Sequence, residues 1–513
     1  MVKLKTSISS LFIFLSLLSL PFLLAWKTDV KAETSVIYVD SRNILGPWDG
    51  TIEHPYRNIT SALKNALDGY TIYVRNGTYV ENLLINKSVS LIGEHTDLTI
   101  IDGSGNENVV VITAENVTIR NFTVRNSGED AMNCGILLNY SNRVVVSYNK
   151  IIQNTNGISL RFSSNNIVLN NTIFSNVLNG LSLHYSSSNT ISYNTITYNI
   201  NAGIYLLSSS NNMISGNTVL SNYYGIHLTL SGENTIYHNN FNNTQQVYSD
   251  TTNSWSYNSE GNYWSEYSGR DLNYDGIGDD PYLVDSTVQD NYPLTGMFSI
   301  FYVDFQGKAY AVPFICNSTI SNFKFEVATE TADRMIIFNV TGKESTTGFC
   351  RIVILTELMN YSLIVTIDNE EVQPNLLSPS NETHRFLYVN YTFSTHTIKI
   401  ISSKTMYLYT QLLGNYAQLQ SDFDSLNASY YEFLDNYTIL SENYSYLQEI
   451  YNQLNNAFLE HLSAYNESIR NFQNLVYIFA ATIAIFLLIT VYLSKRAHVS
   501  ASIKKKVEEE QLT

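Results

Sequence analysis

The sequence predicts a mainly β protein: a parallel β-helix (solenoid), then a β-sandwich, a long coiled-coil helix and a single transmembrane helix. Three observations support this prediction. A unit of 22 or 23 residues recurs between residues 135 and 239, short alternating hydrophobic runs follow over 297–403, and an apolar heptad precedes an uncharged apolar run near the C-terminus. We expect six regions, with these boundaries: a signal peptide at 1–32, the β-helix with its caps at 33–295, the sandwich at 296–404, the coiled-coil stalk at 405–472, the membrane span at 473–494 and a cytoplasmic tail at 495–513.

The charge balance excludes one class of partner. The chain of 513 residues carries a net charge of −16, and only 14% of its residues are charged, against about 25% in an average soluble domain. No basic patch is present to neutralise phosphates, so nucleic acid is not an expected partner.

Both ends of the chain carry apolar segments. Lys3 and Lys5 precede an apolar run over 11–25, and small residues near Ala32 are suited to cleavage, so we expect an export signal, with an uncleaved anchor as the alternative. The run 475–493 has no charged residue and would be about 28 Å long as a helix, which is enough to cross a bilayer. Basic residues follow it from Lys495 onward. The expected location is the plasma membrane, as a type I single-pass protein with its bulk outside and its C-terminus inside.

The repeat is defined by glycine and asparagine. Its glycines are Gly135, Gly157, Gly180, Gly203 and Gly225. A first row of asparagines keeps step: Asn149, Asn171, Asn194, Asn217 and Asn239. A second row follows five residues later, at Asn154, Asn176, Asn199 and Asn222, and Asn121 and Asn126 are expected to begin the two rows. Units this short, with period-2 segments and no amphipathic helical stretch, are typical of stacked β-coils.

Stacking the coils predicts both the core and the role of asparagine. Successive coils lie about 4.8 Å apart, so two inward columns should form: Ile136, Ile158, Leu181, Ile204 and Ile226, and Leu138, Leu160, Leu183, Leu206 and Leu228. Asparagine tolerates left-handed corners and bonds backbone. Stacked amides also bond one another, whereas stacked carboxylates would repel. We therefore interpret the asparagines as a structural ladder.

Two segments carry a family resemblance. Residues 71–85 read TIYVRNGTYVENLLI and residues 262–282 read NYWSEYSGRDLNYDGIGDDPY. They resemble the NosD-like, pectin-lyase-like right-handed parallel β-helix proteins over about residues 35–295. The resemblance implies the fold. Relatives include carbohydrate-binding proteins, sugar hydrolases and lyases, and a copper-related periplasmic protein, so function does not carry over. A short helix over 61–67 is expected to cover the open end of the stack.

Catalysis is not expected in the middle of the β-helix. Sugar hydrolysis needs a pair of carboxylates, and lyase chemistry needs a base, but Glu233 is the only carboxylate between residues 135 and 248. An irregular site near Asp102, Glu129 and Asp130, or near the loop described next, is the basis of an alternative hypothesis of a polysaccharide-active hydrolase or lyase. Copper would need clustered His, Met or Cys, and His184, His227 and His238 do not align in the repeat.

One loop resembles the first half of a calcium-binding loop. In DLNYDGIGDD, oxygen-bearing positions alternate with others, with the candidate ligands Asp271, Asn273, Asp275, Ile277 (through its carbonyl) and Asp279. Tyr282 stands at the twelfth position, where a bidentate Glu belongs, so the alternative is an Asx-rich turn without metal. Nearby aromatics are expected to close the last coil: Trp255, Tyr263, Trp264 and Tyr267.

A candidate ligand-binding patch lies outward of the inward columns. Its residues are Ser159, Arg161, Ser182, His184, Tyr205 and His227. Tyr and His rings stack on sugars and donate hydrogen bonds, so glycans are the expected ligand. The alternative is an ordinary solvated face.

The C-terminal half is expected to space and anchor the head. Seven or so short strands predict a sandwich, in which Cys316 and Cys350 could form a disulfide. From Leu412 to Phe458 apolar residues alternate by three and four, which predicts a coiled coil. No second long helix is expected in the chain, so we predict a homo-oligomer, with a lone helix as the alternative. Sequons are dense, and glycans at Asn427, Asn436 and Asn443 would crowd the coil.

These observations together predict a cell-surface, membrane-anchored, non-catalytic protein. Its partners are expected to be glycans or envelope proteins, as for an adhesin or an envelope-layer component. Calcium is the one cofactor that the sequence suggests.

Overall fold

The computed structural model describes residues 35–285, 288–342, 346–392, 394–443 and 448–510, so the predicted signal peptide lies outside the described residues. The chain divides into two compact units. One holds the β-helix up to Ile300 together with 313–318 and 348–352, and the other holds the rest of the β-sandwich and the C-terminal helices.

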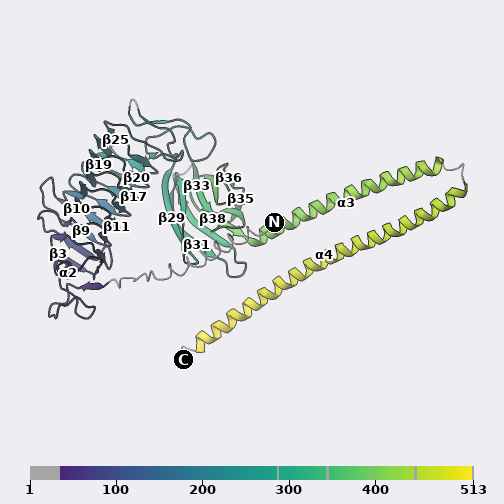
Figure 1. The fold of residues 1–513 in the computed structure, drawn as a ribbon, viewed down its shortest axis with the longest axis horizontal. Coiled ribbons are helices and arrows are strands. Elements are labelled where there is room, and N and C mark those ends of the chain that lie inside the picture. The colour runs from purple at the N-terminus through teal and green to yellow at the C-terminus, as the bar shows by residue number, and fades with distance from the viewer. Residues whose placement is uncertain (1–34, 286–287, 343–345, 393, 444–447, 511–513) are drawn as a thin grey trace, which may run out of the picture. The chain divides into compact units, whose positions relative to one another are not determined.

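The first unit is a parallel β-helix built from three sheets (Figure 1). Sheet 1 contains β1 (Val36–Val39), β2 (Thr71–Val74), β5 (Ser90–Gly93), β8 (Thr118–Arg120), β11 (Val145–Ser147), β14 (Ile167–Leu169), β17 (Thr190–Ser192), β20 (Met213–Ser215) and β23 (Thr235–Tyr237). Sheet 2 contains β3 (Gly77–Val80), β6 (Thr99–Asp102), β9 (Thr123–Arg125), β12 (Lys150–Ile152), β15 (Thr172–Phe174), β18 (Thr195–Thr197), β21 (Thr218–Leu220), β24 (Asn240–Asn242) and β26 (Tyr263–Trp264). Sheet 3 contains β4 (Leu83–Ile85), β7 (Val110–Ile112), β10 (Cys134–Asn139), β13 (Asn156–Arg161), β16 (Leu181–His184), β19 (Ala202–Leu207), β22 (Tyr224–Thr229) and β25 (Gln245–Ser249).

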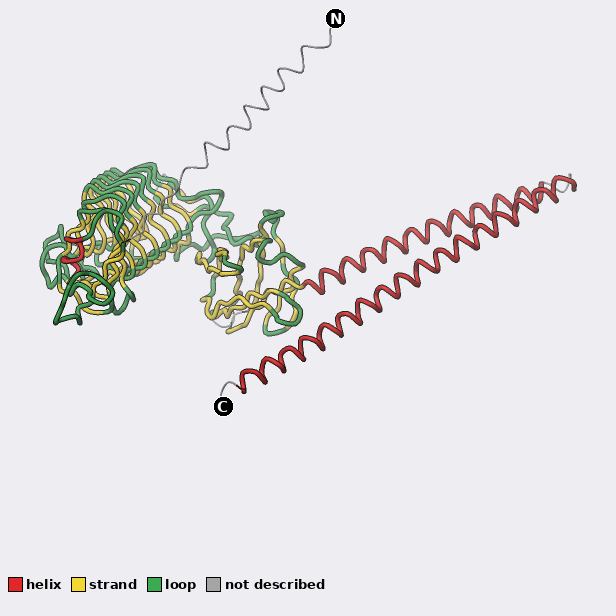
Figure 2. Tube along the Cα trace, turned by 60° about the horizontal axis from the view of Figure 1, so that its bottom comes forward, coloured by secondary structure: helices red, strands yellow, loops and turns green. Residues whose placement is uncertain are grey.

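The predicted inward columns are confirmed. In sheet 3, Ile136, Ile158, Leu181, Ile204 and Ile226 pair in register, as do the five leucines from Leu138 to Leu228. All ten side chains are fully buried. Figure 2 shows the loops between the strands stacked in the same order along the β-helix.

The Asn149 ladder also exists, as a row of hydrogen bonds that run in one direction. Asn149 Nδ2 donates to Asn171 Oδ1 at 3.1 Å, and each later member donates to the next at 2.9–3.0 Å, through Asn194, Asn217 and Asn239 to Asn262. The main-chain N–H of each member donates to the same oxygen. The row ends on Asp290, whose Oδ2 accepts from the Asn262 N–H at 2.8 Å.

Two details of the ladder prediction are wrong. The ladder asparagines do not occupy the left-handed corners; the residue before each does, as at Tyr148, Asn170 and Tyr193. Asn121 and Asn126 sit at such corners, with φ of 65° and 60°, so Phe122 and Ser127 take the ladder positions in that coil.

Both ends of the β-helix are closed. At the start, α2 (Ile59–Asn65) covers the stack with Ile59, Ala62 and Leu63 buried, as predicted. At the other end, Trp264 is fully buried and stacks on Phe241 at 4.8 Å and on Tyr282 at 4.5 Å. A two-stranded ribbon, β27 (Tyr282–Leu283) and β28 (Gln289–Asp290), carries Asp290 to the end of the ladder.

Two five-stranded antiparallel sheets follow the β-helix. One contains β29 (Met297–Phe305), β30 (Lys308–Cys316), β33 (Thr347–Leu355), β37 (His384–Thr392) and β36 (Asn375–Leu376). The other contains β31 (Thr319–Val327), β32 (Arg334–Thr341), β38 (Thr395–Ser403), β34 (Ser362–Ile367) and β35 (Glu370–Val372). Rings of β29 contact rings of β31, as in the Phe301–Phe323 pair at 4.4 Å. Cys316 and Cys350 form a disulfide between β30 and β33.

The C-terminal segment differs from the predicted single stalk. It forms two helices, α3 (Lys404–Asn443) and α4 (Gln448–Glu510). Three ring pairs join them in antiparallel order, so the premise that this chain has no second long helix is wrong. Within the described residues one helical segment, Leu454–Lys495 in α4, is long and apolar enough to cross a membrane, and none of it is buried.

Candidate functional site

The candidate site is the outward face of sheet 3. Strand pairing aligns Leu137, Ser159, Ser182, Tyr205, His227 and Tyr248 in one column, which we call the aromatic column. Asn139, Arg161, His184, Leu207 and Thr229 align beside it. All six predicted patch residues therefore lie in two adjacent columns, as the repeat indicated.

The two serines are more buried than predicted. Ser159 and Ser182 are each 1% exposed, and Ser182 Oγ donates to Ser159 Oγ at 3.1 Å. Arg161 donates from Nη2 to the Met132 carbonyl at 2.6 Å. The Arg161 side chain therefore reaches back along the face to the segment before β10, and the two serines are buried rather than solvent-facing.

The C-terminal part of the face is a continuous cluster of rings. His184 and Tyr205 are 5.6 Å apart between ring centroids, Tyr205 and His227 are 5.2 Å apart, and His227 and Tyr248 are 4.5 Å apart. Tyr224 packs edge-on against His227 at 4.8 Å. Tyr248 was not predicted, because the predicted column ended at His227, one coil earlier. Tyr224 was not predicted, because it lies in neither of the two predicted columns.

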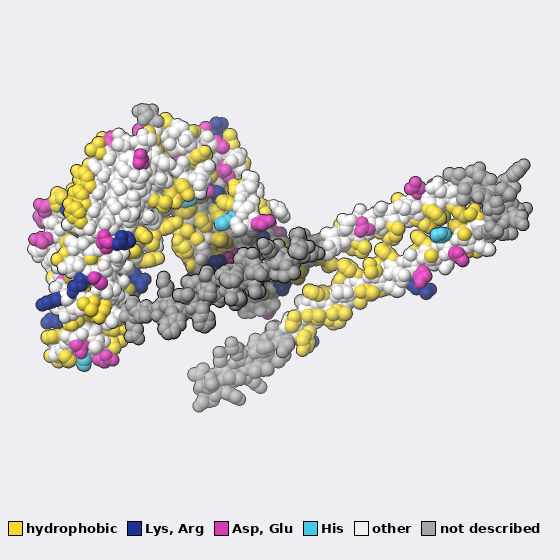
Figure 3. Space-filling model, viewed as in Figure 1, with side chains coloured by type: hydrophobic (Ala, Val, Ile, Leu, Met, Phe, Trp, Pro, Cys, Tyr) yellow, Lys and Arg dark blue, Asp and Glu magenta, His cyan; other side chains and the backbone are white. Residues whose placement is uncertain are grey.

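Apart from Arg161, the face carries no charge at neutral pH, because its two histidines are uncharged. Burial lowers the pKa of His184, and the charge of Arg161 lowers it further. Burial also lowers the pKa of His227, against an opposing effect of Asp250. Both imidazoles are therefore neutral at pH 7, and Figure 3 shows a surface over the coils that is mostly uncharged.

Two polar atoms of the face have unmet hydrogen-bonding capacity. His227 Nδ1 and Arg161 Nε are buried and have no hydrogen-bond partner among the described residues. Buried polar atoms are usually paired. Unpaired ones beside an open aromatic surface are suited to a polar ligand.

The surroundings of Asp102 do not favour the alternative hypothesis of a catalytic site at this residue. Its carboxylate accepts from Arg125 Nε at 2.8 Å, from Asn126 Nδ2 at 3.0 Å and from the Ser104 N–H at 2.9 Å. Burial raises the pKa of Asp102, but these hydrogen bonds and the Arg125 charge outweigh burial and lower it. A carboxylate held in this way does not act as a general acid at neutral pH.

The calcium-like loop is closed by its own hydrogen bonds. Asp271 accepts from the N–H groups of Asp275 and Gly276, and Asp275 accepts from the N–H of Ile277. Asp279 accepts from the Leu272 N–H. Among the described residues, no group of three or more His, Cys, Asp or Glu side chains is arranged to hold a metal.

Calcium binding at this loop stays a prediction. Calorimetric titration with Ca²⁺ tests it, with Asp271→Asn as the matched variant. A heat of binding that the variant loses would support the prediction.

The three histidines considered for copper lie apart from one another. His184 and His227 lie in different columns with Tyr205 between them, and His238 is engaged by Glu260 at 2.6 Å.

Comparisons with known proteins agree with the fold. A family model described as "Periplasmic copper-binding protein (NosD)" matches residues 63–269. No curated protein matches the chain.

Solved structures that resemble the chain include three polysaccharide-modifying enzymes. The A-module of the mannuronan C-5 epimerase AlgE4 from Azotobacter vinelandii is 16% identical, with a TM-score of 0.32 over 44% of this chain and 77% of that one. Pectate lyase Pel9A is 14% identical, with a TM-score of 0.32 over 44% and 82%. An alginate lyase from Paenibacillus sp. is 14% identical, with a TM-score of 0.25 over 38% and 94%. Likeness at this level says nothing about activity. With the three stacked sheets, the matched segment shows that this chain carries a NosD-like parallel β-helix.

Proposed function

We propose that this protein is a membrane-anchored cell-surface protein whose β-helix binds uncharged glycans, or envelope components that display them, without cleaving them. The observation that carries the proposal is the aromatic column, in which His227 Nδ1 is buried without a partner among the described residues. Rings along the column repeat every coil, about 4.8 Å apart, a spacing comparable to one pyranose unit of an extended glycan.

The chemistry of the face supports binding over catalysis. Neutral imidazoles and tyrosines offer ring faces and hydrogen-bond donors to sugar hydroxyls. From residue 135 to residue 248 the only carboxylate is Glu233, which sits at a left-handed corner. A hydrolase or lyase therefore has no paired carboxylates along these coils.

The surface location rests on the C-terminal apolar helix. Its candidate span ends at Lys495, and further lysines follow at 504–506. Basic residues on one side of a span favour the cytoplasm for that side. We therefore propose a type I orientation, with the β-helix outside the cell.

The test measures binding of the full-length chain, in detergent micelles, to an array of neutral glycans. Tyr205→Ala with His227→Ala removes two adjacent rings, and we expect at least a ~10-fold loss of affinity from lost stacking and hydrogen bonds. Tyr198→Ala is the matched control, because Tyr198 is 66% exposed and takes no part in the ring contacts of the column. Equal loss in both variants, or new chain ends in the glycan, would contradict the proposal.

A further inference from the structure

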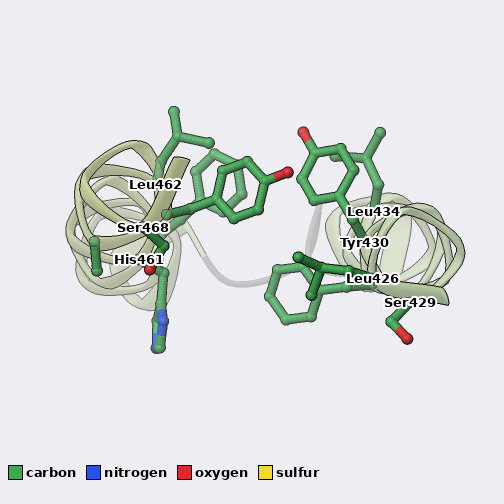
Figure 4. Close-up of a pocket in the computed structure, with 11 residues that line it drawn as sticks. Leu426, Ser429, Tyr430, Leu434, His461, Leu462 and Ser468 are labelled. Carbon is green, nitrogen blue, oxygen red and sulfur yellow. The ribbon is translucent and has the colours of Figure 1, made fainter. Parts of the chain in front are cut away.

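The groove between α3 and α4 is apolar but does not specify an occupant. It is lined by side chains of both helices, among them Tyr430, Leu434 and Leu462 (Figure 4). Apolar heptad residues of this kind pack against many helical partners. A row of side chains on the β-helix is more selective, because its spacing and its neighbours limit what can fit.

This row lies at the corner that follows sheet 3, where the residue directly after each strand is stacked coil upon coil. We call it the corner row, and its members are Tyr140, Phe162, Tyr185, Ser208, Leu230 and Asp250. The first five have left-handed backbone, with φ between 49° and 53°. The main-chain N–H of each of the first four donates to the last carbonyl of the next strand at 3.0 Å. The row therefore rises by one coil, or about 4.8 Å, from each member to the next.

The first three members form a stack of parallel rings. Ring centroids are 4.7 Å apart for Tyr140–Phe162 and 5.1 Å apart for Phe162–Tyr185, and the ring planes differ by 6° and 4°. The three side chains are between 45% and 64% exposed. Phe162 covers one face of the Tyr185 ring, so the other face is turned toward the coil of Ser208.

The stack of rings stops at Ser208 although the backbone continues in the same conformation. Ser208 has a φ of 49° and donates its N–H to the Thr229 carbonyl at 3.0 Å, as the ring-bearing members do to their own partners. Its side chain is only a hydroxymethyl group. The exposed Leu230 bounds this layer on the other side, two coils or about 9.6 Å from Tyr185. A ring between them would lie about 4.8 Å from the Tyr185 ring, within the range of stacked rings.

Polar groups beside this layer favour a sugar ring. Ser208 and Thr229 are half-buried and carry hydroxyls next to it. A pyranose presents a face of C–H groups, which stacks on an aromatic ring, and an edge of hydroxyls, which bonds such partners. A flat aromatic ligand has no comparable edge. The one charged member of the row is Asp250, which accepts from the Leu230 N–H at 2.7 Å and disfavours a carboxylated sugar.

We propose that the layer at Ser208 is a second sugar subsite, which we call the corner subsite. A neutral pyranose with an unbroken C–H face stacks there on Tyr185 as the next ring of the row, and its hydroxyl edge bonds Ser208 and Thr229. The subsite lies three residues, or about 10 Å, from Tyr205 of the aromatic column. The inference rests on the proposed function, because it adds a second contact for a glycan that binds this side of the β-helix.

Saturation-transfer NMR with a single sugar tests the corner subsite. The full-length chain carries Tyr205→Ala and His227→Ala, so that the aromatic column does not contribute, and it is held in micelles of a detergent without a sugar headgroup. The probe is methyl β-glucopyranoside, whose axial C–H groups form an unbroken face. Methyl α-mannopyranoside, a neutral isomer with an axial oxygen on each face, is the control probe. We expect transfer to the axial hydrogens of the glucoside and at least ~5-fold less transfer to the mannoside, because only the glucoside can stack closely.

Two further substitutions, each added to that chain, remove the subsite in opposite ways. Tyr185→Ala takes away the stacking face, and Ser208→Phe fills the layer with a ring of the chain itself. Phe162 has the same backbone conformation as Ser208, so a phenylalanine is tolerated there. We expect both substitutions to abolish the transfer while the unfolding midpoint stays unchanged. Tyr148→Ala removes an exposed ring from a left-handed corner outside the row and should keep the transfer.

This result is separate from the test of the proposed function. The corner subsite is overturned if the chain with Tyr205→Ala and His227→Ala shows no transfer to the glucoside. It is also overturned if the transfer persists in either Tyr185→Ala or Ser208→Phe, or is lost equally in Tyr148→Ala. None of these outcomes bears on the aromatic column, whose role is decided by the affinity of the Tyr205→Ala, His227→Ala chain for the glycan array.

Discussion

Asparagine in this β-helix is selected by the hydrogen bonds of its side chain rather than by backbone conformation. Asn194 Oδ1 accepts from both the main chain and the side chain of Asn171, and Asn194 Nδ2 donates to the Val168 carbonyl at 2.9 Å and to Asn217 Oδ1 at 3.0 Å. All of these groups are buried. The amide is suited to the site because it is donor and acceptor at once.

We therefore expect Asn194→Ala to destabilise the β-helix strongly. It leaves buried groups of Asn171 and Val168 without partners, at about 1–3 kcal/mol for each unmet group. Denaturant titration of the full-length chain measures the change, and Thr195→Ala, one residue on at an exposed position, is the control. Similar unfolding free energies for both variants would contradict the role of the ladder.

Asp290 gives the fold a pH dependence. It is fully buried, and burial raises its pKa from 3.8 to about 6, against hydrogen bonds from Asn262, Trp264 and Tyr292. Between pH 4 and 6 the folded state binds more protons than the unfolded state, so stability falls as pH rises. The expected loss is about 3 kcal/mol.

The matched variant for this effect is Asp290→Asn, which does not titrate. Its unfolding free energy should stay flat over pH 4–6 where that of the parent chain falls. Glu260 acts in a separate window: burial raises its pKa, but His238 and Arg351 lower it to about 2, so its contribution is lost only as pH falls from about 4.5 toward 2. A parent chain with constant stability over pH 4–6 would refute the assignment to Asp290.

The sequence predicted the positions of those residues that follow the 22- or 23-residue repeat. Spacing alone placed the inward columns and the Asn149 ladder, because a fixed period aligns equivalent positions. The same spacing in Asn166, Asn189, Asn212 and Asn234 indicates a further ladder, which the structure contains at 3.0–3.1 Å and which the sequence interpretation missed. Burial of Ser159 and Ser182 could not be predicted, because side-chain contacts such as that of Arg161 with the Met132 carbonyl do not follow the period.

At the scale of elements, the cap at the C-terminal end of the β-helix depends on a close contact between Gly261 and Asp290. A Cβ at Gly261 would lie 2.0 Å from Asp290 Oδ1, so the carboxylate occupies the space of a side chain. We expect Gly261→Ala to displace Asp290 and lower stability by about 1–3 kcal/mol, the usual effect of overpacking. Thermal unfolding measures it, with Gly414→Ala in α3 as control, since nothing lies within 4 Å of that methyl. An unchanged midpoint for Gly261→Ala would contradict this account of the cap.

Single strands and helices were easier to predict than the pairing between them, because a strand or helix shows in a local hydrophobic pattern. Alternating runs predicted seven or so strands over 297–403, and the described part of this region contains ten. Two of the three further strands, β35 and β36, are too short to give a pattern, and the third, β30, was missed although it is nine residues long. The heptad predicted helix correctly, whereas the antiparallel pairing of α3 with α4 could not be read from it. The same heptad residues are suited to an antiparallel partner within the chain and to a parallel partner from another chain.

For the whole molecule, anchoring should depend on the apolar segment alone. A chain that ends at residue 472 loses the apolar run and should become soluble after cell disruption. A chain that ends at residue 496 keeps the run and should stay with membranes, because burial of about 20 apolar residues suffices for insertion. Fractionation with alkaline extraction separates the two outcomes, and membrane retention of the shorter chain would place the anchor elsewhere.

The one-way row of amides has a consequence for how such a head changes in length. Each asparagine donates its main-chain N–H and one side-chain N–H to the next asparagine of the row, and the Asp290 carboxylate accepts the main-chain N–H of the last one, Asn262. Duplication of a 22- or 23-residue unit before Asn262 leaves the hydrogen bond between Asn262 and Asp290 unchanged. Duplication or deletion of a unit therefore changes the length of the β-helix in steps of about 4.8 Å, and the cap that contains Asp290 stays the same.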